Sequence, residues 1–167
     1  FKVSMPGQHS SPNNLKDHPP KSEISKALFA ELVCFFGLSM SLLICLLAPE
    51  ITANDAGELA AAAHELGIAH PPGFPVFLVY ENILMQMLGL GELGFRGNVG
   101  SAICASICLC IVLAMVRTRG VPVSIAWLVC LATLFAPIFT VHAVTVEVYA
   151  GAALFVIVAV ECLLRYL

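Results

Sequence analysis

Four apolar stretches, at residues 27–48, 98–116, 121–140 and 148–164, constrain the fold of this chain more than any other feature. A helix needs about 20 apolar residues to cross the hydrocarbon core of a bilayer, and each stretch is close to that length. Inside a bilayer the backbone polar groups must be bonded within the segment, which favours helices. Since 59% of the residues are hydrophobic and only 11% are charged, we predict an all-α, polytopic helical membrane protein.

The charge and cysteine patterns exclude other classes of protein. The net charge is -3 and no run of five lysines or arginines occurs, so a nucleic-acid partner is not expected. All of the cysteines lie within apolar stretches, where they are expected to pack as small apolar side chains. No histidine or carboxylate lies near Cys104, Cys108 and Cys110 in sequence, which argues against a zinc site there.

The two ends of the sequence suggest a fragment of a longer protein. The chain begins with Phe1 rather than methionine, and Leu167 ends an apolar run. Residues 1–22 are rich in Pro, Ser, Asn and Lys and hold too little apolar surface to fold, so we expect a disordered cytoplasmic tail.

Residues 49–97 are predicted to form a long first loop outside the cytosol, with two short helices at 56–66 and 75–90. The second of these is the harder to place, because it is short for a span and carries Glu81, Asn82 and Gln86 in its middle. We predict that it lies in the membrane interface and does not cross. Glu81 is expected to be solvated or interfacial, as are Glu92 and Glu161.

The distribution of cations supports this topology, because lysine and arginine collect on the cytoplasmic side of a membrane protein. Lysines precede the first stretch, which predicts a cytoplasmic N-terminus (Lys16, Lys21 and Lys26). If 75–90 does not cross, Arg117, Arg119 and Arg165 are cytoplasmic as well. The same topology places the remaining polar candidates on the opposite face (Asp55, Glu58, His70, Arg96, His142 and Glu147).

A polar island at residues 55–75 directly follows the first apolar stretch, and ionisable groups at a membrane face are candidates for a functional site. Asp55 and Glu58 precede an alanine-rich segment that ends at Gly67, a pattern typical of an N-capped helix with a glycine stop. The alternative is that Asp55 accepts the proton of a substrate hydroxyl. Spacing alone does not decide between the two.

His70 begins the sequence His70-Pro-Pro-Gly-Phe-Pro75, whose prolines stiffen the backbone and present the imidazole in a fixed position. The ring is expected either to contact a ligand or simply to hydrogen-bond within its turn. Arg96, before the second stretch, is placed to bind a phosphate or to reach the interface as an ordinary anchoring residue. Glu147, before the last stretch, contributes a carboxylate or is merely solvated.

Four motifs occur in this chain in a fixed order: Asp55-Ala-Gly-Glu58-Leu, His70-Pro-Pro-Gly, Arg96-Gly-Asn98 and Glu147-Val-Tyr149. In this respect residues 51–155 resemble the O-mannosyltransferase-like membrane proteins of the GT-C glycosyltransferase superfamily. The resemblance implies the N-terminal part of a GT-C type fold, with a long first lumenal loop that contains interfacial helices. This chain has Ala56 where many relatives have serine and Phe74 where they have tyrosine.

The resemblance also implies an activity: transfer of a sugar, expected to be mannose, from a dolichyl- or polyprenyl-phosphate donor to a protein hydroxyl. It makes Asp55, Glu58 and His70 the catalytic candidates. Arg96, Asn98, Glu147 and Tyr149 are then the substrate-binding candidates. The expected location is the endoplasmic reticulum membrane in a eukaryote, or the inner membrane in a bacterium.

Two alternatives stay open from the sequence. One is a transporter or ion-pathway component in which Asp55, His70 and Glu147 relay protons, although such charges usually lie deeper within spans. The other is a catalytically inactive GT-C-like assembly subunit, which the small number of spans keeps open. No metal ligands are assigned, and a divalent metal at the carboxylates is left open.

Overall fold

The structure is a computed structural model that describes residues 21–50 and 55–167. Within these ranges the chain forms helices and no strands, which confirms the predicted all-α fold. The helices are α1 (Lys21–Leu46), α2 (Ala56–Glu65), α3 (Pro75–Met87), α4 (Leu93–Thr118), α5 (Val123–Leu134), α6 (Pro137–Ala143) and α7 (Val148–Tyr166). The tail was predicted at residues 1–22; residues 1–20 lie outside the described residues, and residues 21–22 belong to α1.

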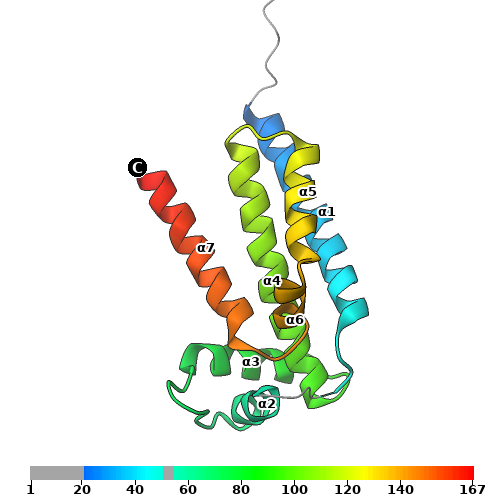
Figure 1. Ribbon diagram of the computed structural model, residues 1–167, viewed down its shortest axis with the longest axis vertical. Helices are drawn as coiled ribbons and strands as arrows, with labels where there is room; N and C mark the ends of the chain where they lie inside the picture. Colours follow the sequence, from blue (N-terminus) through cyan, green and yellow to red (C-terminus); the bar gives the residue numbers. More distant parts are fainter. Residues whose placement is uncertain (1–20, 51–54) are drawn as a thin grey trace, which may run out of the picture.

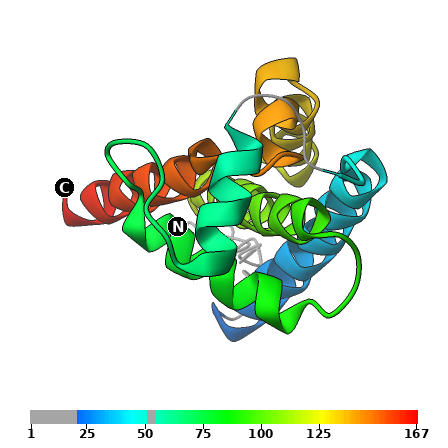
Figure 2. The same ribbon diagram turned by 90° about the horizontal axis from the view of Figure 1, so that it is seen from below.

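The long helices run along the molecule, and the two short helices of the first loop lie across one end of it (Figure 1). Seen from that end, α2 and α3 lie in front of the centre of the molecule, while α1 and the α5–α6 pair stand to the side (Figure 2). We call this the loop end; it also contains the α6–α7 corner. The opposite end, where α4 turns into α5 and α7 finishes, we call the arginine end, after Arg117, Arg119 and Arg165.

Three of the helices are long and apolar enough to cross a membrane: Ser25–Leu46 within α1, α4 and α7. Helices α5 and α6 pass the same test together, which gives up to four spans if the bent pair counts as one. Helix α3 is not among them, since its 13 residues extend only about 20 Å at 1.5 Å per residue. The chain is therefore a multi-pass membrane protein.

The stretch predicted as one transmembrane helix at 121–140 forms two helices, α5 and α6, with a bend of 70° between them. Pro137 has no N–H to donate to the preceding turn and disfavours helical backbone in Ala136, which is extended at φ -65° and ψ 124°. The Thr140 hydroxyl replaces part of the backbone bonding that is lost at the bend, because it donates to the carbonyl oxygen of Leu134 at 2.6 Å.

Other helix ends also differ from the predicted bounds. Helix α1 begins at Lys21, before the predicted 27, and α4 begins at Leu93, before the predicted 98. Polar residues can continue a helix beyond the hydrocarbon core, so the apolar run marks only the part inside it. Helix α3 is shorter than predicted and ends at Met87.

Helix α4 lies at the centre of the fold and packs against α1, α3, α5 and α7. Its loop-end half carries Gly97 at the point where α3 and the α6–α7 corner both approach it. A Cβ on Gly97 would lie 2.5 Å from Cγ2 of Val146 and 2.8 Å from Cε of Met85. The absence of a side chain at this position therefore lets three segments meet.

At the arginine end one carboxylate ties three helices together. Glu31 of α1 accepts a hydrogen bond from Nε of Arg117 at 3.0 Å and another from Nε1 of Trp127, also at 3.0 Å. Arg117 in addition donates to the carbonyl oxygen of Val121 at 2.7 Å. We call this group the Glu31 clasp (Glu31, Arg117 and Trp127); it joins α1, α4 and α5.

Replacing Gly97 by alanine tests the close approach to α4. The added methyl group must displace Val146 and Met85, and overpacking of this kind costs about 1–3 kcal/mol of unfolding free energy. Gly37→Ala is the matched control, because a Cβ at Gly37 meets no atom within 4 Å and alanine favours a helix by roughly 0.5–1 kcal/mol. Thermal unfolding in detergent should show a lower midpoint for the first variant only; equal midpoints would contradict the packing described.

Candidate functional site

Asp55 stands at the N-cap of α2, but its side chain makes no capping hydrogen bond. Its backbone is in the right-handed helical region, at φ -76° and ψ -6°, instead of the extended conformation from which a cap side chain usually reaches back. The side chain is 61% exposed. The capping interpretation of this carboxylate is therefore wrong, and the group is available for another partner.

The other end of α2 finishes differently from the predicted glycine stop. Leu66 adopts the left-handed conformation, at φ 52°, and the N–H of Gly67 donates to the carbonyl oxygen of Ala62 at 2.8 Å. From α3, the amide of Asn82 donates to the carbonyl oxygen of Ala63 at 2.9 Å. These bonds satisfy carbonyls that a helix C-terminus leaves open and hold α2 on α3.

The turn after α2 presents His70. Its carbonyl oxygen accepts a hydrogen bond from the N–H of Gly73 at 2.9 Å, and Gly73 has a φ of 88° that glycine tolerates. Phe74 follows as the N-cap of α3, and its ring lies edge-on to the imidazole with centroids 5.5 Å apart. The position of the imidazole is thus linked to the start of α3.

His70 is bound to Glu58 and lies near Asp55. The backbone N–H of His70 donates to Oε1 of Glu58 at 2.6 Å, and Nδ1 of the ring lies 3.2 Å from Oε2 of the same carboxylate. These bonds, the backbone one first, lower the pKa of Glu58, which is therefore ionised at neutral pH. Nε2 of the ring lies 3.9 Å from Oδ2 of Asp55.

This arrangement assigns different chemistry to the two carboxylates. Glu58 orients the ring by accepting from Nδ1–H, a pattern that leaves Nε2 as an acceptor in the neutral imidazole. Asp55 and Nε2 are too far apart for a hydrogen bond to each other. A hydroxyl oxygen beside this pair, at hydrogen-bond distance from both atoms, would have two proton acceptors within reach.

Glu147 joins the same site from the start of α7. Its backbone N–H lies 3.4 Å from the hydroxyl oxygen of Ser101 in α4. Burial raises the pKa of Glu147, and the nearby charge of Asp55 raises it further, whereas His142 and His70 act to lower it. Glu147 thus lies close enough to Asp55 and His70 for their charges to act on it, although it follows His70 by 77 positions in sequence.

His142 and Tyr149 form an aromatic pair beside Glu147. Their ring centroids are 4.6 Å apart, and Tyr149 is exposed. Nδ1 of His142 is buried and has no hydrogen-bond partner among the described residues. The predicted topology placed His142 on this face, but we did not predict it as a site residue. The one sequence signal for it is its position five residues before Glu147.

Arg96 and Asn98 are engaged in contacts that hold the fold. Arg96 donates to the carbonyl oxygens of Gly91 and Met85, at 3.0 and 3.2 Å, and so covers the C-terminal end of α3. Asn98 is buried, and its amide donates to the carbonyl oxygen of Ala48 at 2.9 Å. The substrate-binding roles of both residues stay predictions.

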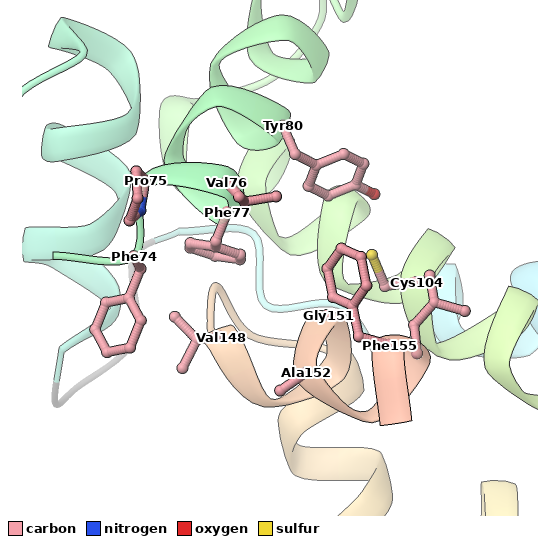
Figure 3. A pocket seen from close by; sticks show the side chains of 11 residues that line it. Phe74, Pro75, Val76, Phe77, Tyr80, Cys104, Val148, Gly151, Ala152 and Phe155 are labelled. Atoms are coloured by element: carbon pink, nitrogen blue, oxygen red, sulfur yellow. The ribbon is translucent and has the colours of Figure 1, made fainter. Parts of the chain in front are cut away.

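An apolar pocket of about 430 Å³ opens beside the polar group. It lies between α3, α4 and α7, and the side chains that line it are shown in Figure 3. Phe74, which contacts His70, and Val148, which follows Glu147, both line it. Tyr80 contributes a hydroxyl, which donates to the carbonyl oxygen of Gly100 at 2.8 Å. The pocket therefore continues the site toward the apolar part of the molecule.

In residues 21–50 and 55–167, no three His, Cys, Asp or Glu side chains gather closely enough to hold a metal ion. The divalent ion at the carboxylates therefore stays open, as it was from the sequence.

A family comparison matches residues 55–167 to the N-terminal domain of protein O-mannosyl-transferase TMEM260. The chain belongs to this family. The match begins at Asp55 and takes in every candidate site residue. It confirms the resemblance to O-mannosyltransferase-like proteins that the motifs indicated.

Two curated relatives share shorter segments. Protein O-mannosyl-transferase TMEM260 of Mus musculus is 35% identical over 75 residues, which cover 45% of this chain and 10% of the relative. Its counterpart in Dictyostelium discoideum is 42% identical over 40 residues, or 24% of this chain and 5% of the relative. The aligned segments thus span a tenth or less of these relatives. No solved structure matches the chain.

Removing the Glu58 carboxylate should release the His70 turn. In Glu58→Ala the backbone N–H of His70 loses its acceptor, so its amide should exchange with solvent faster at neutral pH. Hydrogen exchange followed by mass spectrometry of peptides covering 66–73 measures this. Glu65→Ala, at the exposed C-terminal end of the same helix, is the control and should leave exchange unchanged. Equal exchange in both variants would show that the Glu58 bond does not hold the turn.

Proposed function

We propose that this chain forms the acceptor-activating part of a membrane O-mannosyltransferase. The observation that carries the proposal is the His70 imidazole, which Glu58 holds so that Nε2 faces the uncapped Asp55 carboxylate. Family membership supports it, since the matching relatives are named protein O-mannosyl-transferases. The expected location is the endoplasmic reticulum membrane, with the loop end in the lumen.

In the proposed reaction, the hydroxyl oxygen of a protein acceptor attacks the anomeric carbon of a mannosyl phosphate. A bond forms between these two atoms while the bond from the anomeric carbon to the phosphate oxygen breaks, and its electron pair leaves on the phosphate. Asp55 accepts the hydroxyl proton as the new bond forms. His70 lies on the other side of the hydroxyl and limits its orientation.

The apolar pocket supports a donor carried on a lipid. Its volume of about 430 Å³ lies in the range of ligand sites, and its walls are almost wholly aliphatic and aromatic (Figure 3). Val76 and Phe155 line the pocket and are themselves 65% exposed, so the pocket opens sideways to where a bilayer would be. A dolichyl or polyprenyl chain fits such a surface, and its phosphate would then lie at the loop end.

The phosphate of this donor needs cations, and the described part of the site is acidic. Asp55 and Glu58 lie on either side of the His70 ring, and the charge of Asp55 also acts on Glu147. Arg96 already donates to two backbone carbonyls. Arg96 is the residue proposed for the phosphate, with Asn98 and Tyr149 as further contacts. Its remaining N–H groups are the ones that would bind, because the two observed bonds use Nε and one proton on Nη1.

Asp55→Asn tests the proposal directly. The amide keeps the shape of the side chain but accepts no proton, so transfer should fall by roughly 100-fold to 10,000-fold, the usual contribution of a general base. The assay uses membranes that contain the full-length protein, radiolabelled polyprenyl-phosphate mannose and a library of serine and threonine peptides. Glu65→Gln, on the exposed end of α2, is the matched control. Wild-type transfer by the Asp55 variant would refute the assigned role.

A further inference from the structure

Glu81 is a fully buried acid that the proposed reaction does not use. It lies in the middle of α3 on the side that faces α4, and its side chain is 0% exposed. Neither carboxyl oxygen has a hydrogen-bond partner among the described residues. The expectation that Glu81 is solvated or interfacial is therefore wrong: its helix lies across the end of the bundle, but this side chain points into the fold.

Gly100 of α4 provides the space for this carboxyl group. The three atoms nearest to a Cβ built on Gly100 all belong to Glu81, and both carboxyl oxygens would overlap with it. Gly97 lies one turn earlier and admits Met85, the residue one turn after Glu81 on α3. Two glycines on α4 thus accommodate two side chains of α3 that lie one helical turn apart.

The groups around Glu81 offer it no compensating positive charge. On its own helix, the Tyr80 hydroxyl donates to the carbonyl oxygen of Gly100, and from α4 the Cys104 thiol lies close enough for the Glu81 charge to act on it. Arg96 bonds to the C-terminal end of α3, and from α2 the exposed His64 and Glu65 lie near Asn82. An unpaired carboxylate in such surroundings is so costly that a buried acid keeps its proton instead. Burial accordingly raises the pKa of Glu81 to about 8.

Helix α3 connects Glu81 and its protonation state to the candidate site. Phe74, directly before the helix, contacts the His70 ring, and Asn82, next to Glu81, holds the end of α2. We propose that Glu81 is a positioning residue: it must carry its proton for α3 to lie on α4, and this packing keeps His70 beside Glu58 and Asp55. The link to activity rests on the proposed function, but the link to folding does not.

The direction of the pH effect follows from the raised pKa. A group that binds its proton more tightly in the folded state stabilises that state fully below its unfolded pKa, near 4.5, and loses the contribution as pH rises toward 8. The folded protein should thus be most stable in mild acid and become less stable through neutral pH. Glu81→Gln has no proton to lose and should not follow this trend.

The first experiment compares the full-length wild type with Glu81→Gln by thermal unfolding in detergent between pH 5 and pH 9. From pH 5 to 8 the unfolding constant of the wild type should rise relative to that of the variant by up to about tenfold per pH unit, the limit for one proton. Glu65→Gln should behave as the wild type. Parallel curves for the wild type and Glu81→Gln would overturn the proposal.

A second experiment tests the contact itself. Gly100→Ala should destabilise the wild type, because its methyl group overlaps the carboxyl group, and should be tolerated in a Glu81→Ala background where that space is empty. Equal effects of Gly100→Ala in both backgrounds would show that Glu81 does not occupy this space, and would also overturn the proposal.

The pH profile of mannosyl transfer separates positioning from mere stability. At a temperature where both proteins stay folded, wild-type transfer should decline above about pH 8, while Glu81→Gln should keep its activity there. Identical profiles would refute the link from Glu81 to the site. If no variant transfers mannose at any pH, the proposed function fails, whereas the unfolding comparison still decides the role of Glu81.

Discussion

The close crossing of α3 over α4 is the contact on which the rest of the loop end depends. It is possible because Gly97 and Gly100 present bare backbone, so that Met85 and Glu81 can approach α4 without a gap. Helix α3 in turn supports α2 through Asn82 and fixes the His70 turn through Phe74. Small residues commonly bring helices together within membranes, where burial of apolar surface gives little drive for association.

The site combines features that no single segment supplies. Asp55 and Glu58 come from the start of α2, His70 from a proline-rich turn, and Glu147 from the start of α7. Each lies at or beyond a helix end, where a charged group stays in contact with water while its backbone is held by the fold. The arrangement gives a polar site directly against an apolar pocket, as the proposed reaction between a hydroxyl and a lipid-borne sugar requires.

Much of this could be predicted from the sequence, since hydropathy and charge report directly on the membrane environment. They predicted the all-α class, which the structure shows, and a short helix at α3, which is not among the candidate spans. Its position in the membrane interface stays a prediction. The break before Pro137 was missed because a span with an internal proline often stays continuous. Asp55 matched a capping pattern that the backbone does not adopt, and Glu81 looked solvated because the glycine that accommodates it lies 19 residues away, on another helix.

The Glu31 clasp has a consequence for how the bundle settles on one arrangement. Helices that are apolar on all sides have no stripe of hydrophobic residues to select one rotation about their own axes. Glu31 accepts bonds from α4 and α5 at the same time, and turning α1 by one residue, about 100°, would lose both. This carboxylate therefore acts as a rotational key: it contributes less through net binding energy than by excluding the other orientations of α1.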